Sequence, residues 1–412
     1  MFPRIALFFF GASCAIAQTS PLSLDEAIHI AWANDPTAAA LALTPELARA
    51  REEQVGIRPN PDVELRGSVP AKGDSEWGVG IGLSQRLPRR DRIEQARALA
   101  RLGGATAELQ LREQRRHVAG EVRRLYYGAA LQQTRGNLAR RALDVQRELR
   151  ASLEKRRAAG EIATSDIDLL AFEVSRAEQA LAFADADLAA SLQQLRGRLR
   201  LPAQAPLAIN GDLETILSRS IPSETATLES ARPTLALAAH RVRVAEAALA
   251  LTRAETRGDW TIGGGVDFER RADDYTRTLN NEPRVSVNAS VPWPRGVANR
   301  GDIREKQAAV RIAEAELIAL RDELTAEITA STATARALQP VLLAHRVTLA
   351  PGAAIPDSLR AAYERGEVTS LQLVQVRQQR FALESDYLTT AARYAAALAE
   401  AETAAGLVPA QR

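Results

Sequence analysis

The sequence predicts a mainly α-helical protein that also carries a small set of membrane β-strands. Three observations point to this fold class. Long segments carry apolar residues at heptad spacing, four shorter segments alternate apolar residues with small or polar ones, and the whole arrangement occurs twice in 412 residues. Aromatic residues make up only 4% of the chain, and Ala, Leu, Arg and Glu are abundant, as is typical of long helices and coiled coils.

Residues 1–17 have the pattern of an export signal peptide. Arg4 supplies a positive charge, residues 5–11 form a short apolar stretch, and residues 15–17 read Ala-Ile-Ala, a cleavage site. The only cysteine, Cys14, lies inside this segment, in a context that is poor for lipidation. Cleavage after Ala17 would leave a mature chain without disulfides, so we expect an exported protein.

Charges of both signs are interspersed along the chain, with 53 Lys and Arg against 51 Asp and Glu. This balance provides no basic surface, so we expect no nucleic-acid partner and interpret the arginines as solvated helix faces. No segment after residue 17 has the length and apolarity of a transmembrane helix. Any membrane insertion would therefore use strands.

The duplication is clearest at two glycine turns. Gly160-Glu161 and Gly366-Glu367 each follow one long helical pattern and precede another. Each copy is predicted to contain a helix, two strands, a very long helix, the turn and a further long helix. We expect the first copy at residues 18–200, a connector rich in proline and glycine at 201–230, the second copy at 231–406 and a tail at 407–412.

The helices are predicted from heptad patterns, which are typical of antiparallel helical hairpins. Residues 90–159 contain no proline, and as one helix they would extend about 100 Å. Helices of that length exceed a globular core and predict an extended barrel or stalk. In the second copy, Pro340, Pro351 and Pro356 precede the turn, and each proline costs a helix hydrogen bond or a break. We therefore expect the second hairpin to be bent and to be the one that moves on opening. The alternative is that the prolines mark only a local kink. The heptad positions are Ile167, Val174, Leu181, Leu188 and Leu195, then Val374, Phe381, Leu388 and Ala395.

The strand signal is alternation with a period of two, at residues 63–69, 77–84, 260–269 and 285–291. Each run has one apolar face and one face of small or polar residues, as in a transmembrane barrel strand. A half-buried soluble sheet shares this alternation, but the export signal and the glycine-rich face favour the membrane. Trp77, Trp260 and Trp293 stand at run ends, where interfacial aromatic residues would lie.

Four strands cannot close a transmembrane barrel, and an open sheet edge in lipid leaves backbone groups unsatisfied. Several copies must therefore combine their strands. Two copies would give eight strands and a barrel filled by its own side chains, whereas three would give twelve strands and a passage. Physical reasoning alone allows three or more.

The chain resembles the TolC-like outer-membrane efflux proteins, over essentially its whole mature length. The residues that carry the resemblance are Leu22-Ser23-Leu24-Asp25-Glu26-Ala27, Asn34-Asp35-Pro36, Arg58-Pro59-Asn60-Pro61, Gly82-Leu83-Ser84-Gln85 and the two Gly-Glu turns. The Arg-Pro-Asn-Pro segment and the short C-terminus look most like the branch that serves Czc-type heavy-metal efflux.

This resemblance implies a homotrimer in the cell outer membrane, with a twelve-stranded β-barrel and a periplasmic helical barrel. It implies a passive exit duct of a tripartite efflux system, and the Czc-like features suggest heavy-metal cations as the substrates. The partners would be a periplasmic adaptor (membrane-fusion) protein, an inner-membrane pump of the RND type and outer-membrane lipid.

The resemblance also suggests functional residues. Gly160, Glu161, Gly366 and Glu367 would form the periplasmic tip that contacts the adaptor, although glycines and acids at such turns also serve simply as caps and solvated groups. Asp166 and Tyr363 match a closed-state lock, in which the tyrosine hydroxyl would donate to the carboxylate. Asp166 would equally stabilise the first turn of its own helix.

One departure from the family pattern concerns the pore constriction. Gln372 and Gln375 stand where family members often carry aspartates, so a ring of neutral amides would bind cations less strongly than carboxylates.

We expect no cofactor and no metal site, because His29, His117, His240 and His345 are scattered along the chain. No phosphate-binding loop or nucleophile motif indicates an enzyme. The rival interpretations are a periplasmic adaptor, which would have a single hairpin, and a soluble coiled-coil scaffold, which leaves the alternating strands unexplained.

Overall fold

The computed structural model describes residues 21–69, 76–158, 164–222, 232–272, 278–292, 300–350, 355–365 and 367–407. The predicted signal peptide, Gly160, Glu161, Gly366 and Trp293 lie outside these ranges. The chain divides into two compact units. We call residues 1–38, 114–231 and 324–412 the helical unit, and residues 39–113 and 232–323 the sheet unit. Each unit is assembled from segments of both sequence copies.

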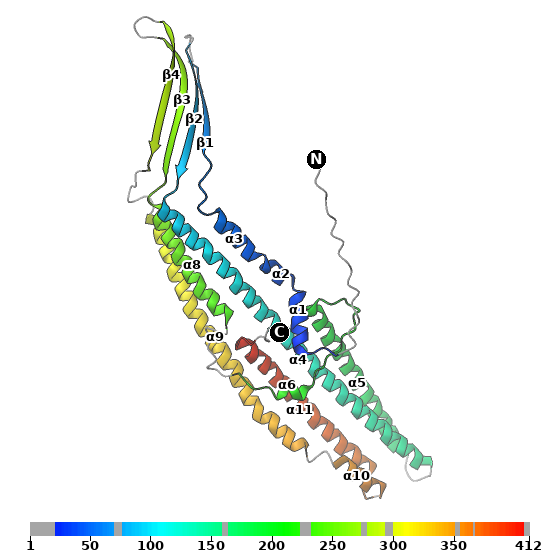
Figure 1. Ribbon diagram of the computed structural model, residues 1–412. Helices are drawn as coiled ribbons and strands as arrows, with labels where there is room; N and C mark the ends of the chain where they lie inside the picture. The colour runs from blue at the N-terminus through cyan, green and yellow to red at the C-terminus, as the bar shows by residue number, and fades with distance from the viewer. Residues whose placement is uncertain are drawn as a thin grey trace. The chain divides into compact units, whose positions relative to one another are not determined.

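Both copies place helical residues, then two strands, then long helices along the chain (Figure 1). Three helices precede the strands in the first copy, where a single helix was predicted, and one helix precedes them in the second. The first set is α1 (Leu24–Ala33), α2 (Pro36–Ala42), α3 (Thr44–Gln54), β1 (Asp62–Ser68), β2 (Trp77–Leu87), α4 (Arg90–Ala158) and α5 (Thr164–Leu199). A short helix, α6 (Leu213–Leu217), follows in the connector. The second set is α8 (Pro233–Glu255), β3 (Trp260–Ala272), β4 (Leu279–Ser290), α9 (Arg300–Leu349), α10 (Ile355–Glu364) and α11 (Ser370–Ala404).

The long helix predicted over residues 90–159 is confirmed. Helix α4 has 69 residues, which corresponds to about 100 Å at 1.5 Å per residue. Its counterpart in the second copy is divided. Helix α9 continues through Pro340 and ends at Leu349, two positions before Pro351, and α10 begins at Ile355. Within the described residues, no helix combines the length and apolar composition needed to cross a membrane.

Pro340 interrupts neither the helix nor its packing. Ala335, which precedes Pro340 in α9, and Leu342, which follows it, are both buried in the hydrophobic core of the helical unit. This packing holds the helical backbone in place although proline cannot donate its backbone hydrogen bond. Pro340 therefore costs a backbone hydrogen bond but does not break the helix.

The helical unit begins with a well-capped helix. The Ser23 side chain accepts a hydrogen bond from the Glu26 backbone, and the Glu26 carboxylate accepts from the Ser23 backbone, a capping box at the start of α1. Small residues such as Ala27 and Ala31 let α1 pack closely in a core shared with α4 and α5. Several predicted heptad positions are buried, namely Ile167, Val174, Leu195, Val374, Leu388 and Ala395.

The sheet unit contains one antiparallel sheet with strand order β1-β2-β3-β4. The central pairing, β2 with β3, joins the two sequence copies edge to edge. Ile81 lies opposite Leu65 on one side and Val266 on the other, whereas Gly80 lies opposite Arg66 and Asp267. This register collects the apolar residues of all four strands on one face and the small and charged residues on the other.

Candidate functional site

The apolar face of the sheet is exposed. Val287 is 83% exposed and Leu65 is 78% exposed, far more than is usual for large apolar side chains in contact with a core. The face extends across all four strands, and large contiguous apolar surfaces of this kind are typical of membrane or protein contacts. Its exposed members are Val63, Leu65, Trp77, Val79, Ile81, Leu83, Trp260, Ile262, Phe268, Val285 and Val287.

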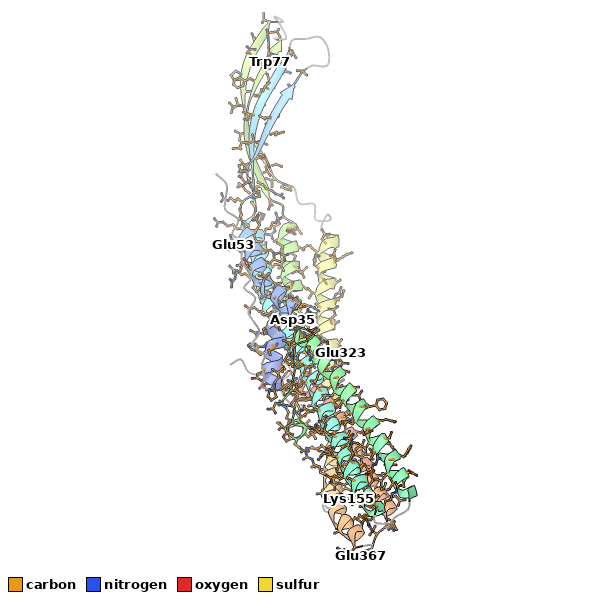
Figure 2. All side chains as sticks on the ribbon, turned by 90° about the vertical axis from the view of Figure 1, so that its right-hand side faces the viewer. Asp35, Glu53, Trp77, Lys155, Glu323 and Glu367 are labelled. Carbon is orange, nitrogen blue, oxygen red and sulfur yellow. The ribbon has the colours of Figure 1, made fainter. Side chains whose placement is uncertain are left out.

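Two tryptophans bound this apolar face at its two ends. Trp77 begins β2, and Trp260 lies opposite Leu87, the last residue of β2. Both side chains are about half exposed, at 43% and 48%. Ten residue steps along a strand correspond to roughly 33 Å, close to the ~30 Å hydrocarbon core of a bilayer. Figure 2 labels Trp77 at one end of the sheet.

The other end of the sheet is attached to the helices by a buried carboxylate. The Asp259 side chain is only 2% exposed and lies directly before β3. It forms an ion pair of 3.1 Å with Arg86 at the end of β2, accepts a hydrogen bond from the Arg89 backbone, and also contacts the Arg92 guanidinium. Strand ends and the start of α4 are thereby fixed to one another.

The ends of the two helical hairpins meet in the helical unit. Leu153 from α4, Leu170 from α5, Tyr363 from α10 and Leu373 from α11 are buried in one apolar cluster. Lys155 and Glu367, which belong to different hairpins, are labelled at the same end of the helices in Figure 2. The helix ends that flank the first glycine turn therefore pack against the helix ends that flank the second.

The predicted gate residue Tyr363 contacts a partner that sequence reasoning missed. The Arg156 guanidinium lies over the Tyr363 ring, 4.9 Å from its centroid, within the range of a cation–π interaction. The Tyr363 hydroxyl is buried and has no hydrogen-bond partner among the described residues. The side chain of Asp166 lies outside the described residues, so its contact with Tyr363 stays a prediction. The only sign of this contact in the sequence was the presence of Arg156 near the end of α4.

The second turn carries a local ion pair. The Arg365 guanidinium donates to both carboxylate oxygens of Glu367, at 2.7 and 3.0 Å. This pairing lowers the pKa of the exposed Glu367 carboxyl. The Glu367 backbone N–H donates to the Ala362 carbonyl at 2.9 Å, a bond of the kind that closes helix C-termini. Glu367 thus presents an ionised but compensated carboxylate at the surface.

Gln372 and Gln375 lie in the first turns of α11. Gln372 accepts hydrogen bonds from the Thr369 backbone at 3.0 Å and from the Thr369 hydroxyl at 3.1 Å, which completes a capping box. The Gln375 side chain is exposed. Sequence reasoning did not anticipate the capping function of Gln372, although the spacing Thr369-x-x-Gln372 is its signature.

A groove of about 710 Å³ lies between the first hairpin and α11. Arg377 reaches across it, because its guanidinium donates to the Val145 carbonyl at 3.4 Å. Apolar and charged residues of α4, α5 and α11 line the groove, among them Leu138, Val145, Glu173, Ala177, Phe381 and Glu384.

Two of the predicted non-ligand histidines, His240 and His117, lie near other groups of the protein. His240 is buried, and its Nε2 lies 2.8 Å from the Leu102 carbonyl oxygen. His117 is half exposed and lies 3.8 Å from Glu121. In the part of the chain that the structure describes, no group of three or more His, Cys, Asp or Glu residues is arranged to hold a metal ion.

Comparison with solved structures identifies the fold. CusC, a transmembrane channel, matches with a TM-score of 0.69 and 18% identity over 93% of this chain and 92% of its own. The outer membrane protein VceC of Vibrio cholerae matches with a TM-score of 0.69 and 15% identity over 93% of this chain and 96% of its own. The chain has the TolC-like fold of outer-membrane channels.

The same fold occurs in the outer-membrane channel OprN, with a TM-score of 0.69, 16% identity, and coverage of 93% of this chain and 89% of that one. No family model and no curated protein sequence matches the chain. The predicted combination of long helical hairpins and four strands per chain is confirmed.

Proposed function

We propose that this protein is the outer-membrane channel of a tripartite efflux system and acts as a passive exit duct. The observation that carries the proposal is the exposed apolar face of the four-stranded sheet, bounded at both ends by Trp77 and Trp260. Lipid is the environment that makes such a face stable, and tryptophans suit the membrane–water interfaces. The cell outer membrane is the location that accepts strands of this kind.

The opposite face of the sheet supports an aqueous passage. It carries glycine, serine, asparagine and charged residues, which water solvates and lipid does not. A four-stranded sheet has two unpaired edges, at β1 and β4. We infer a homotrimer, in which each β4 pairs with the β1 of the next copy and twelve strands close into a barrel.

An adaptor protein and a soluble scaffold are less well supported. An adaptor would carry one helical hairpin, whereas this chain has two, α4–α5 and α9–α11, with a pair of strands before each. A soluble scaffold would leave Val285, Val287 and the other exposed apolar side chains of the sheet in water.

We infer that the hairpin tip binds a periplasmic adaptor, which links the channel to an inner-membrane pump of the RND type. Gly160, Glu161, Gly366 and Glu367 are the proposed contact residues. Because Arg365 already neutralises Glu367, the adaptor would meet an ion pair rather than a free acid at the second turn. The groove between the first hairpin and α11 provides an adjacent surface for a partner helix.

We propose Tyr363, Asp166, Gln372 and Gln375 as gate residues. Tyr363 belongs to the second hairpin, and its ring already contacts Arg156 of the first, so separating the hairpins must break this contact. A cross-link between Asp166→Cys and Tyr363→Cys variants should block efflux, and unaltered transport would remove the lock hypothesis.

Heavy-metal cations are the proposed cargo only at the level of sequence resemblance. The described residues offer no metal cluster, so a metal would be selected by the pump rather than by the duct.

Membrane fractionation followed by native mass measurement tests the proposed function. The proposal predicts a trimer that sediments with the outer membrane and needs detergent for extraction. A monomer in the soluble periplasmic fraction would rule the channel out.

A further inference from the structure

An ion pair crosses the polar face of the sheet from β1 to β3. Arg66 and Asp267 each lie directly opposite Gly80, on its two sides. Their side chains therefore point from the same face of the sheet with one strand between them. The Arg66 guanidinium lies 3.7 Å from the Asp267 carboxylate, so the pair bridges β2 at Gly80.

Glycines on β2 and β3 make this bridge possible. A Cβ atom at Gly80 would fall far inside van der Waals contact with the Asp267 carboxylate. A Cβ atom at Gly82 would lie 2.6 Å from the Arg66 guanidinium, and one at Gly265 would lie 3.1 Å from it. The two charged groups thus lie flat against the backbone instead of projecting away from the sheet.

The charges of this face compensate one another further. Arg66 also lies 3.7 Å from Glu64, and Arg284 lies 3.5 Å from Glu269. Asp267 is the most enclosed of these, with its side chain only 17% exposed against 46% for Arg66. Replacing Asp267 would leave Arg66 with Glu64 alone, and neutralising either member of the central pair would change the net charge of this polar face by one unit.

On the basis of the proposed channel function, we propose that Arg66 and Asp267, held flat over Gly80, set the charge preference of the passage through the strand region. Together they present a nearly neutral wall to passing solutes. The glycines keep both the lumen wide and the two charges within reach of each other. An uncompensated charge a few ångströms from a passing ion changes its local concentration severalfold.

A thiol at Ser286 can report this charge. Ser286 lies opposite Gly265 on the polar face of the sheet, and the Arg66 guanidinium lies over Gly265. The only other cysteine in the sequence is Cys14, and the parent chain, which lacks the Ser286→Cys change, measures its background reaction. The probes are a trimethylammonium and a sulfonate methanethiosulfonate reagent of equal size, applied to the outside of intact cells. The measured quantity is the ratio of the cationic to the anionic reaction rate.

In the Ser286→Cys chain, Asp267→Asn should lower this ratio about threefold and Arg66→Gln should raise it about threefold. Gly80→Ala should lower the ratio in the same direction as Asp267→Asn, because it displaces the carboxylate from Arg66. Gly67→Ala is the matched control, since a Cβ atom there meets nothing within 4 Å, and the ratio should not change. A trimer on a native gel verifies that each variant has folded. Because Arg66→Gln and Asp267→Asn each test the charge claim independently, the claim remains testable if only one of the two variants folds.

The outcomes separate this inference from the proposed function. Ratios equal in all backgrounds would overturn the charge claim while leaving the channel intact, and Gly80→Ala behaving like Gly67→Ala would overturn the role of the glycine. If the thiol reacts with neither reagent, the polar face does not line an aqueous passage and the proposed function itself fails.

Discussion

The Arg123 guanidinium lies 2.8 Å from the carboxylate of Glu402, and both side chains are buried, with 3% and 2% exposed. Glu402 also accepts hydrogen bonds from the Tyr127 hydroxyl at 3.0 Å and from Arg219 at 2.7 Å. Arg123 in turn donates to the Leu407 carbonyl at 2.8 Å. One carboxylate thus connects α4, the connector and the end of α11 inside the helical unit.

Replacing Glu402 with glutamine should destabilise the helical unit by about 3–5 kcal/mol, because it leaves the buried Arg123 charge without its partner. The free energy of unfolding in detergent, followed by far-UV circular dichroism, measures this. Glu400→Gln is the matched control, since Glu400 lies on the same helix and is exposed. A change equal to that of the control would mean that Glu402 does not stabilise the core.

Tyr126 should titrate late. Burial, followed by the nearby charge of Glu26, raises the pKa of this phenol to about 12. Its hydroxyl also donates to the Leu22 carbonyl at 2.9 Å. Because the pKa is raised in the folded chain, the free energy that the neutral phenol contributes to folding is fully present below the ordinary pKa of about 10. This contribution is lost as the pH rises towards 12. The difference in tyrosinate absorbance between the parent chain and Tyr126→Phe should have its midpoint near 12; a midpoint near 10 would contradict the burial argument.

The contact of Arg156 with Tyr363 should help keep the hairpins together. Arg156→Gln removes a cation–π interaction of about 1 kcal/mol, which corresponds to roughly a fivefold shift in a closed–open equilibrium. Entry of a bulky antibiotic into cells whose own channel is deleted measures leakage. Lys155→Gln removes the same charge from an exposed neighbour and should leave leakage unchanged. Equal leakage in both variants would assign the effect to net charge rather than to the ring contact.

Gln375→Asp should make the channel sensitive to trivalent cations. In the proposed trimer, three carboxylates would replace three amides, and a trivalent cation is attracted strongly by such a ring. Single-channel conductance in a planar bilayer should fall severalfold when hexaamminecobalt(III) is added. Gln375→Asn, which keeps the amide, should show no block. A channel of Gln375→Asp that is insensitive to cobalt would exclude this residue from the constriction.

The sequence predicted the elements well where one local rule dominates. The lack of proline predicted α4 nearly to its last residue, and alternation predicted that β2 and β3 begin at Trp77 and Trp260. Strand β4 begins earlier than predicted, at Leu279, because its first half carries Asn280, Asn281 and Pro283 instead of an alternating pattern. Pairing with β3 supplies the order that the local sequence does not.

The site contacts were less accessible to sequence reasoning. Arg123 and Glu402 are separated by 279 positions, and nothing in either local segment indicates the other. Arg156 and Tyr363 likewise come from different sequence copies, and their contact depends on how the hairpins pack. The bridge from Arg66 to Asp267 requires the register of three strands, which alternation alone does not fix.

Accessibility of spin labels along residues 285–288 of β4 tests the central claim most directly. With cysteines introduced singly at Val285, Ser286, Val287 and Asn288, the channel account predicts a period of two. Labels at Val285 and Val287 should be relaxed by lipid-soluble oxygen, and those at Ser286 and Asn288 by a water-soluble nickel complex. Equal access of the nickel complex to all four positions in outer-membrane vesicles would contradict a lipid-facing apolar surface, and with it the channel.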